Sequence, residues 1–164
     1  MRRFTDDDRR RAIRRVLSGF AREDDLAAVL RDLAALEPCD DIFLAEVLLE
    51  LAADAIEEAR VTRQDSVDYH QIRERYLPEV EFRGRSDHFK SHYALRAAPM
   101  IAGGVTPDLA DDASWWRAEN LWVYSTYALL AYLRIASART GDSTADICRR
   151  IAQRHAVDLA QTSV

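Results

Sequence analysis

Two histidines stand four residues apart in the segment 87-DHFKSH-92, a spacing at which a helix brings both imidazole rings to one face. His88 and His92 could therefore share a divalent transition metal, because imidazole nitrogens are good ligands for zinc, nickel or iron. A catalytic metal site needs at least one more ligand, and His70 and Asp87 are candidates for it. The spacing thus offers one hypothesis, a metal-dependent helical-bundle enzyme, although such a short motif more often marks two surface histidines.

A second pair lies near the C-terminus, where Arg150 and His155 begin and end the segment 150-RIAQRH-155. This R-x4-H spacing resembles the pair used by HEPN-type helical ribonucleases, in which the histidine transfers protons and the arginine binds phosphate. The resemblance implies a metal-independent ribonuclease with Arg150 and His155 as its catalytic residues. The match is confined to this segment, and cationic side chains at a helix C-terminus also complement the helix dipole.

A row of carboxylates interrupts the otherwise apolar segment 40-DDIFLAEVLLELAADAIEEAR-60. Like charges four residues apart on a helix repel each other, so solvent, a cation or the N-terminal arginines must offset them. Consecutive helices usually pack as neighbours, so we predict an ion pair between residues 23–60 and at least one of four arginines. The carboxylates are Glu46, Glu50, Asp54, Glu57 and Glu58, and the arginines are Arg10, Arg11, Arg14 and Arg15.

The net charge of −5 combines a basic first segment with an acidic second one. Residues 1–22 carry eight Arg and three Asp, a balance of +5, whereas residues 23–60 carry two Arg and twelve carboxylates, a balance of −10. Domains that bind nucleic acid usually show a clearly basic face and an isoelectric point above about 9. Here the isoelectric point is about 5.4, so a nucleic-acid partner is not expected.

Apolar residues recur with helical periodicity along nearly the whole chain, which predicts an all-α fold. We expect one domain, residues 1–164, built as a bundle of about seven helices. Basic and then acidic helices should fill residues 1–60, and short helices and loops should fill residues 61–112. Residues 113–164 should hold a long, aromatic-rich core helix over 113–139, in which we expect Leu129 and Leu133 to be buried, and a C-terminal helix. Pro99 is expected to end a helix that begins near residue 87.

The sequence lacks a glycine-rich phosphate loop, a nucleophile elbow and a CxxC pair. These absences favour a non-enzymatic regulatory or protein-binding module with an unknown protein partner and no cofactor. Trp115 and Trp116, at the predicted start of the long helix, are the candidate binding residues, because rigid aromatic side chains anchor protein partners. Helices that are apolar on several sides should leave apolar surface uncovered, so we predict a homodimer through the C-terminal half.

Cys39 and Cys148 lie far apart in the chain, and we interpret them as free thiols in a reducing cytoplasm. The N-terminus shows no apolar segment of the kind found in signal peptides. The longest uncharged stretch, residues 120–133, has fourteen residues, whereas a membrane-spanning helix needs about twenty. We therefore expect a cytoplasmic protein without membrane insertion.

Overall fold

The computed structural model describes residues 3–37, 39–59, 68–116 and 120–159, and for residues 113–116 it describes the backbone alone. Within these residues the chain forms eight helices and no strand, which confirms the all-α prediction. The helices are α1 (Asp6–Ala21), α2 (Leu26–Ala34), α3 (Asp41–Glu58), α4 (Tyr69–Tyr76), α5 (Gly84–Ala102), α6 (Leu109–Trp116), α7 (Leu121–Thr140) and α8 (Thr144–Arg154).

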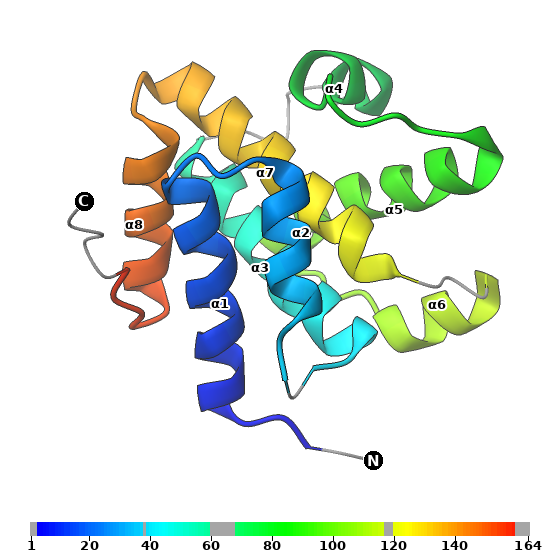
Figure 1. Cartoon of the computed structure of the whole chain (residues 1–164). Helices are drawn as coiled ribbons and strands as arrows, with labels where there is room; N and C mark the ends of the chain where they lie inside the picture. Colours follow the sequence, from blue (N-terminus) through cyan, green and yellow to red (C-terminus); the bar gives the residue numbers. More distant parts are fainter. Residues whose placement is uncertain (1–2, 38, 60–67, 117–119, 160–164) are drawn as a thin grey trace.

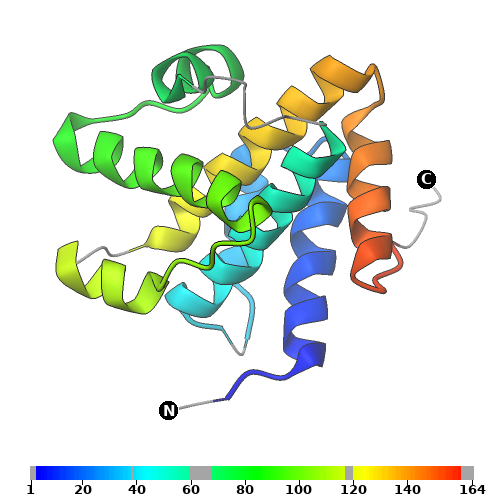
Figure 2. The same ribbon diagram turned by 180° about the vertical axis from the view of Figure 1, so that it is seen from behind.

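Two helices, α3 and α7, pack against each other at the centre of the bundle (Figure 1). Helices α1, α2 and α8 lie on one side of this pair, and α4, α5 and α6 lie on the other (Figure 1). Seen from behind, α5 lies against the central pair, with α6 beside it (Figure 2). The central helices are buried around most of their circumference because neighbours cover them from both sides.

Leu129 and Leu133 of α7 have no exposed surface, which confirms the prediction that both side chains are in the core. They belong to a single cluster of buried apolar side chains to which α3 and α7 contribute more than any of the other helices.

Local signals in the sequence locate several helix ends correctly. The Thr5 hydroxyl accepts a hydrogen bond from the Asp8 amide, and the Asp8 carboxylate accepts one from the Thr5 amide, so a capping box begins α1. The Ser143 hydroxyl begins α8 by accepting from the Asp146 amide. Gly141 ends α7 in the left-handed conformation at φ 78°, which is readily accessible to glycine.

Helix α5 is longer than the sequence predicts, because Pro99 lies inside it rather than after its end. A proline has no amide hydrogen, so the carbonyl of Leu95, one turn earlier, loses its usual partner within the helix. The hydroxyl of Tyr132, on α7, donates a hydrogen bond of 2.6 Å to that carbonyl. This contact between helices replaces the missing bond, and α5 continues to Ala102. The prediction of only short helices between residues 61 and 112 is therefore wrong.

The predicted long helix over 113–139 is also wrong, because two helices, α6 and α7, occupy this region. Asn120 adopts the left-handed conformation at φ 61°, which a continuous helix does not contain, and its side chain does not cap α7. The carboxylate of Asp41, at the start of α3, instead accepts hydrogen bonds from the amides of Leu121 and Trp122 at 3.2 and 2.8 Å. Helix α7 therefore begins where a side chain from a distant segment satisfies its first amides.

Within the described part of the chain, none of the helices combines the length and the hydrophobicity needed to cross a bilayer.

Candidate functional site

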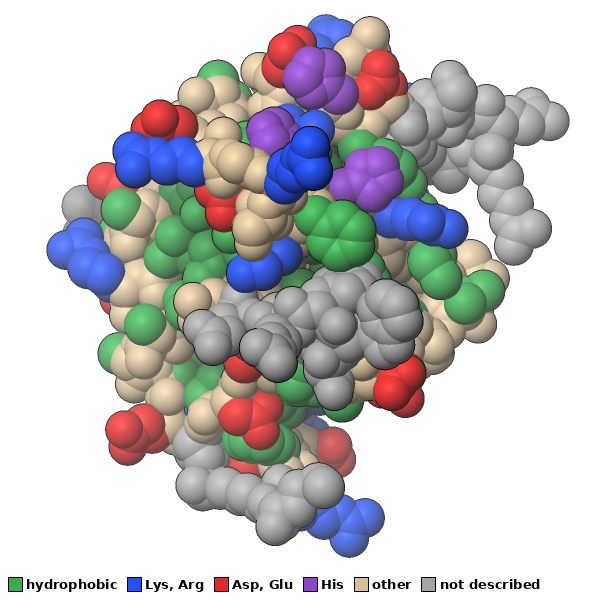
Figure 3. All heavy atoms as spheres, turned by 90° about the vertical axis from the view of Figure 1, so that its right-hand side faces the viewer, with side chains coloured by type: hydrophobic (Ala, Val, Ile, Leu, Met, Phe, Trp, Pro, Cys, Tyr) green, Lys and Arg blue, Asp and Glu red, His purple; other side chains and the backbone are tan. Residues whose placement is uncertain are grey.

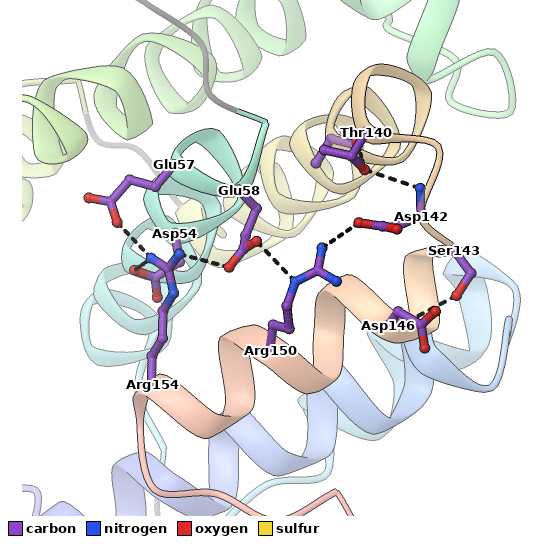
Figure 4. Close-up of polar contacts among 10 residues, drawn as sticks. Asp54, Glu57, Glu58, Thr140, Asp142, Ser143, Asp146, Arg150 and Arg154 are labelled. Carbon is purple, nitrogen blue, oxygen red and sulfur yellow. Dashed lines mark hydrogen bonds and ion pairs between the residues drawn. The ribbon is translucent and has the colours of Figure 1, made fainter.

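The carboxylates at the C-terminal end of α3 face α8, and ion pairs connect the two helices (Figure 4). Glu58 accepts hydrogen bonds from Arg150 at 3.1 Å and from Arg154 at 2.7 Å. Arg154 also donates to Glu57 at 2.6 Å, and Arg150 donates to Asp142 at 2.9 Å. The acidic end of α3 is thus neutralised by arginines from the C-terminal helix.

His155, which follows α8 directly, belongs to the same cluster. Its Nε2 atom lies 2.5 Å from Oδ2 of Asp54, and both side chains are largely buried. Such a pair has the composition of an acid–base dyad, and Arg150 lies on the neighbouring turns of α8. The structure places Arg150 and His155 in one cluster of charged side chains, which Asp54, Arg154 and Glu58 connect.

The charges of this cluster oppose a ribonuclease site. Its four carboxylates, those of Asp54, Glu57, Glu58 and Asp142, outnumber the two guanidinium groups, and the total stays negative even with His155 protonated. A phosphodiester would meet net repulsion there, because like charges repel strongly at short range. The cluster is better understood as a connection that holds α8 against α3.

The predicted ion pairs of the N-terminal arginines are wrong. Within the described residues, Arg9 is the residue of α1 that pairs with the acidic stretch, through Glu50 at 2.6 Å. The apolar face of α1 packs into the core, and the arginines on its other faces have other partners. Arg10 pairs with Asp7, and Arg11 lies near Asp8 and donates to the backbone carbonyl of Glu37 at 3.1 Å. None of Arg10, Arg11, Arg14 and Arg15 forms an ion pair with a described carboxylate of residues 23–60.

The other three histidines lie together on the face formed by α4 and α5. Figure 3 shows histidine side chains gathered on this face, with cationic and hydrophobic side chains between them. The guanidinium of Arg73 lies among them, since it donates to the backbone carbonyl of His88 at 3.3 Å and lies 3.5 Å from Nδ1 of His70. His92 contacts the edge of the Tyr69 ring, with ring centroids 4.6 Å apart.

This arrangement does not favour the metal hypothesis. Among the residues that the structure describes, no group of three histidine, cysteine, aspartate or glutamate side chains is placed to hold a metal ion. Arg73 already puts a positive charge among the histidines, and a metal ion there would be repelled by it. His70 is engaged elsewhere, since its Nε2 lies 3.0 Å from Glu74.

Asp87, the other candidate ligand, has a structural role. One of its oxygens accepts a hydrogen bond from the Tyr124 hydroxyl at 2.6 Å, and the other accepts from the Arg83 amide at 2.7 Å. These bonds connect the start of α5 to α7. They also lower the pKa of the Asp87 carboxyl, because hydrogen bonds from Tyr124 and Arg83 favour the charged form.

Asp87→Asn is expected to reduce stability by about 1 kcal/mol at neutral pH, since it weakens a hydrogen bond to a charged group. Because the pKa of Asp87 is lower in the folded chain, its ionised form stabilises the fold above the ordinary aspartate pKa, and this contribution is lost as the pH falls. Thermal melts between neutral and acidic pH should therefore show a smaller loss of stability in the variant than in the natural chain. Equal losses in both proteins would contradict this assignment.

The predicted binding residues Trp115 and Trp116 belong to α6, and their side chains lie outside the described residues. Two exposed hydrophobic side chains were not predicted. Phe89 of α5 and Val105, in the loop between α5 and α6, are each 53% exposed. A signal for Phe89 is present in the sequence, because an aromatic residue stands alone among the polar residues of 87-DHFKSH-92.

Helix α5 presents different chemistry on its two sides. On the side of α6, the Tyr93 hydroxyl donates a hydrogen bond of 2.6 Å to Asp112. Phe89 precedes Tyr93 by one helical turn and Met100 follows two turns later, so these residues share one face of α5, with the exposed Arg96 between Tyr93 and Met100. Together with Val105 they form an apolar strip along α5 that Arg96 interrupts. On the side of α4, His92 contacts Tyr69.

Comparison of the chain with protein-family models, with curated proteins and with solved structures finds no match. The functional conclusion therefore depends on the chain's own geometry.

Proposed function

We propose that the chain is a non-enzymatic, regulatory protein-binding module that self-associates as a homodimer through the apolar strip of α5. The observation that carries this proposal is the exposure of Phe89 and Val105, the exposed large hydrophobic residues of the described surface. A contact that removes both side chains from water is favourable because apolar area is buried. In a two-fold dimer the same strip is used twice, so a single surface is sufficient.

Charge at the two ends of the strip supports a second copy as the partner. Arg85 lies in the first turn of α5 and is exposed, and Asp108 is exposed just before α6, beyond the other end of α5. Two copies of α5 packed antiparallel bring Arg85 of each chain toward Asp108 of the other. This complementarity favours the two-fold arrangement over other orientations. Trp115 and Trp116 of α6 are expected to extend the interface.

Two further observations favour this proposal over the catalytic alternatives. The cations of the Arg150 and His155 cluster are engaged by carboxylates, and Arg73 lies among the histidines of α4 and α5.

Cys39 and Cys148 are free thiols, and Cys148 is buried. We infer a reducing, cytoplasmic location for the protein, in which free thiols persist.

Light scattering tests the dimer directly. At micromolar concentration we expect a mass of twice the 18.7 kDa of one chain. The double variant Phe89→Ser, Val105→Ser should raise the dissociation constant about tenfold or more, because it removes the apolar area that association would bury. A measured mass of one chain for the natural protein, or an unchanged dissociation constant for the double variant, would overturn the proposed interface.

A charge exchange serves as the control for orientation. Arg85→Glu should weaken the dimer by placing like charges opposite each other, and adding Asp108→Arg to the same chain should restore the association. Arg85 is on the surface, so Arg85→Glu should leave the melting temperature close to that of the natural chain. The carboxylate of Asp108 accepts a hydrogen bond of 3.0 Å from the Asp111 amide at the start of α6, so Asp108→Arg should lower the melting temperature by removing this cap, and the mass is measured well below both melting transitions. Failure of the second substitution to restore the mass would contradict the antiparallel arrangement.

A further inference from the structure

We propose that the edge between α4 and α5 binds a phosphate monoester group through Arg73, Arg96 and His92. The site is built from residues of α4 and α5, whereas the dimer proposal depends on Phe89 and Val105. Arg96 lies on the same face of α5 as Tyr93 and Met100, so the two proposals share part of one helix, and each is tested with its own variants and its own measurement.

Arg73 is the fixed part of the site. Its guanidinium donates to two neutral oxygens of α5, the backbone carbonyl of His88 and the hydroxyl of Ser91, each at 3.3 Å. It also lies over the Phe82 ring, 5.7 Å from the centroid. These contacts hold the side chain in place but leave its charge uncompensated, because within the described residues no carboxylate pairs with it. A positioned guanidinium with a free charge is well suited to an oxyanion.

Arg96 supplies the second positive charge from α5. It follows His92 by one helical turn, so both side chains lie on the same face of the helix. Burial lowers the pKa of His92, and the positive charges of Arg73 and Arg96 lower it further. Burial raises the pKa of Tyr69 of α4, whose ring contacts His92, and the positive charge of Arg96 opposes this rise. The two arginines, from two helices, thus converge on one histidine.

The carboxylates near this edge have other partners. Glu74 lies 3.0 Å from His70, and Asp68 caps α4 by accepting from the His70 and Gln71 amides. Asp87 is held by Tyr124. Within the described residues none of these carboxylates forms an ion pair with Arg73 or Arg96, so both guanidinium groups keep donors that an external anion can accept from.

A phosphate monoester fits this site better than a carboxylate does. It carries a charge of about −2 and three acceptor oxygens, which match two guanidinium groups and one imidazole donor. A carboxylate carries one negative charge and would leave one of the two arginines uncompensated. The same group occurs on small phosphorylated molecules and on phosphorylated side chains, and the experiment distinguishes these sources.

The test is a titration followed by nuclear magnetic resonance of the His92 ring. Inorganic phosphate and phenyl phosphate should shift its resonances in a saturable way, and Arg96→Gln should weaken this binding about tenfold, since it removes a charge-assisted bond. Arg96 makes no described hydrogen bond, so this variant is expected to keep its fold. Arg75→Gln is the matched control, because it removes the same charge from an α4 arginine that lies over Tyr76.

The outcomes separate the sources and decide the proposal. Tighter binding of phenyl phosphate than of a phosphotyrosine peptide, which carries the same aryl phosphate, identifies a small molecule as the natural source, and the reverse order identifies a phosphorylated side chain. A His92 resonance that does not respond to any of the three probes overturns the site. Equal weakening by Arg96→Gln and Arg75→Gln also overturns it, because general electrostatic attraction would then explain the binding.

Discussion

Leu129→Ala is expected to lower the free energy of unfolding by about 2–5 kcal/mol, which is the usual cost of truncating a fully buried leucine. Leu129 has no exposed surface and lies on α7, one of the two central helices. Neighbours on both sides of α7 restrict the collapse of the surrounding structure, so a cavity should remain after truncation. Urea denaturation of the natural chain and the variant measures the difference.

The neighbouring residue provides the control. Leu130 is 5% exposed and lines a surface groove between α2, α7 and the segment around Val80. Leu130→Ala removes the same atoms from a site that water and flexible side chains can refill, so its cost should be smaller than that of Leu129→Ala. Equal costs for the two variants would show that the centre of α7 is not packed as described.

Tyr132→Phe is expected to cost about 1–3 kcal/mol, because it leaves the buried carbonyl of Leu95 without a donor. The hydroxyl of Tyr132 bonds to this carbonyl at 2.6 Å, and Pro99 cannot supply the amide that would normally do so. Burial raises the pKa of Tyr132 above its ordinary value, so the hydroxyl remains protonated at neutral pH. Chemical denaturation of the variant gives the cost directly.

A double-mutant cycle isolates the contribution of the proline. Pro99→Ala restores an amide hydrogen one turn after Leu95, which allows the carbonyl to form its helical hydrogen bond. In that background, Tyr132→Phe should cost less than it does in the natural chain, because the carbonyl keeps a partner. The same cost in both backgrounds would refute the view that Tyr132 replaces the bond that Pro99 removes.

The sequence by itself determined the fold class and most helix boundaries. Helical periodicity and capping residues are local properties, and the contacts that they describe join residues only three or four positions apart. The capping box at Thr5 and the left-handed glycine at 141 illustrate this, since each marks a helix end through hydrogen bonds to residues three or four positions away. The burial of Leu129 and Leu133 followed from the same periodicity.

Only the tertiary structure shows where contacts between distant residues override the helix ends that the local sequence indicates. A proline such as Pro99 usually ends a helix. Here the Tyr132 hydroxyl, 33 residues later in the chain, donates to the Leu95 carbonyl in place of the missing amide, and α5 continues. Helix α7 begins at Leu121 because Asp41, on another helix, satisfies its first amides. A pattern read over a few residues contains no information about donors and acceptors that folding brings from elsewhere.

The candidate sites likewise depend partly on the sequence and partly on contacts that form only in the folded chain. Residue types and spacing identified the histidines of α4 and α5, the acidic row of α3 and the pair Arg150 and His155 as charged clusters. The packing of the helices determines which charged side chains form ion pairs, because α8 rather than α1 lies against the acidic end of α3. Likewise, the position of Arg73 among the histidines follows from the docking of α4 on α5. The sign of the charge at each site, and therefore its chemistry, depends on side chains that are neighbours only in the folded chain.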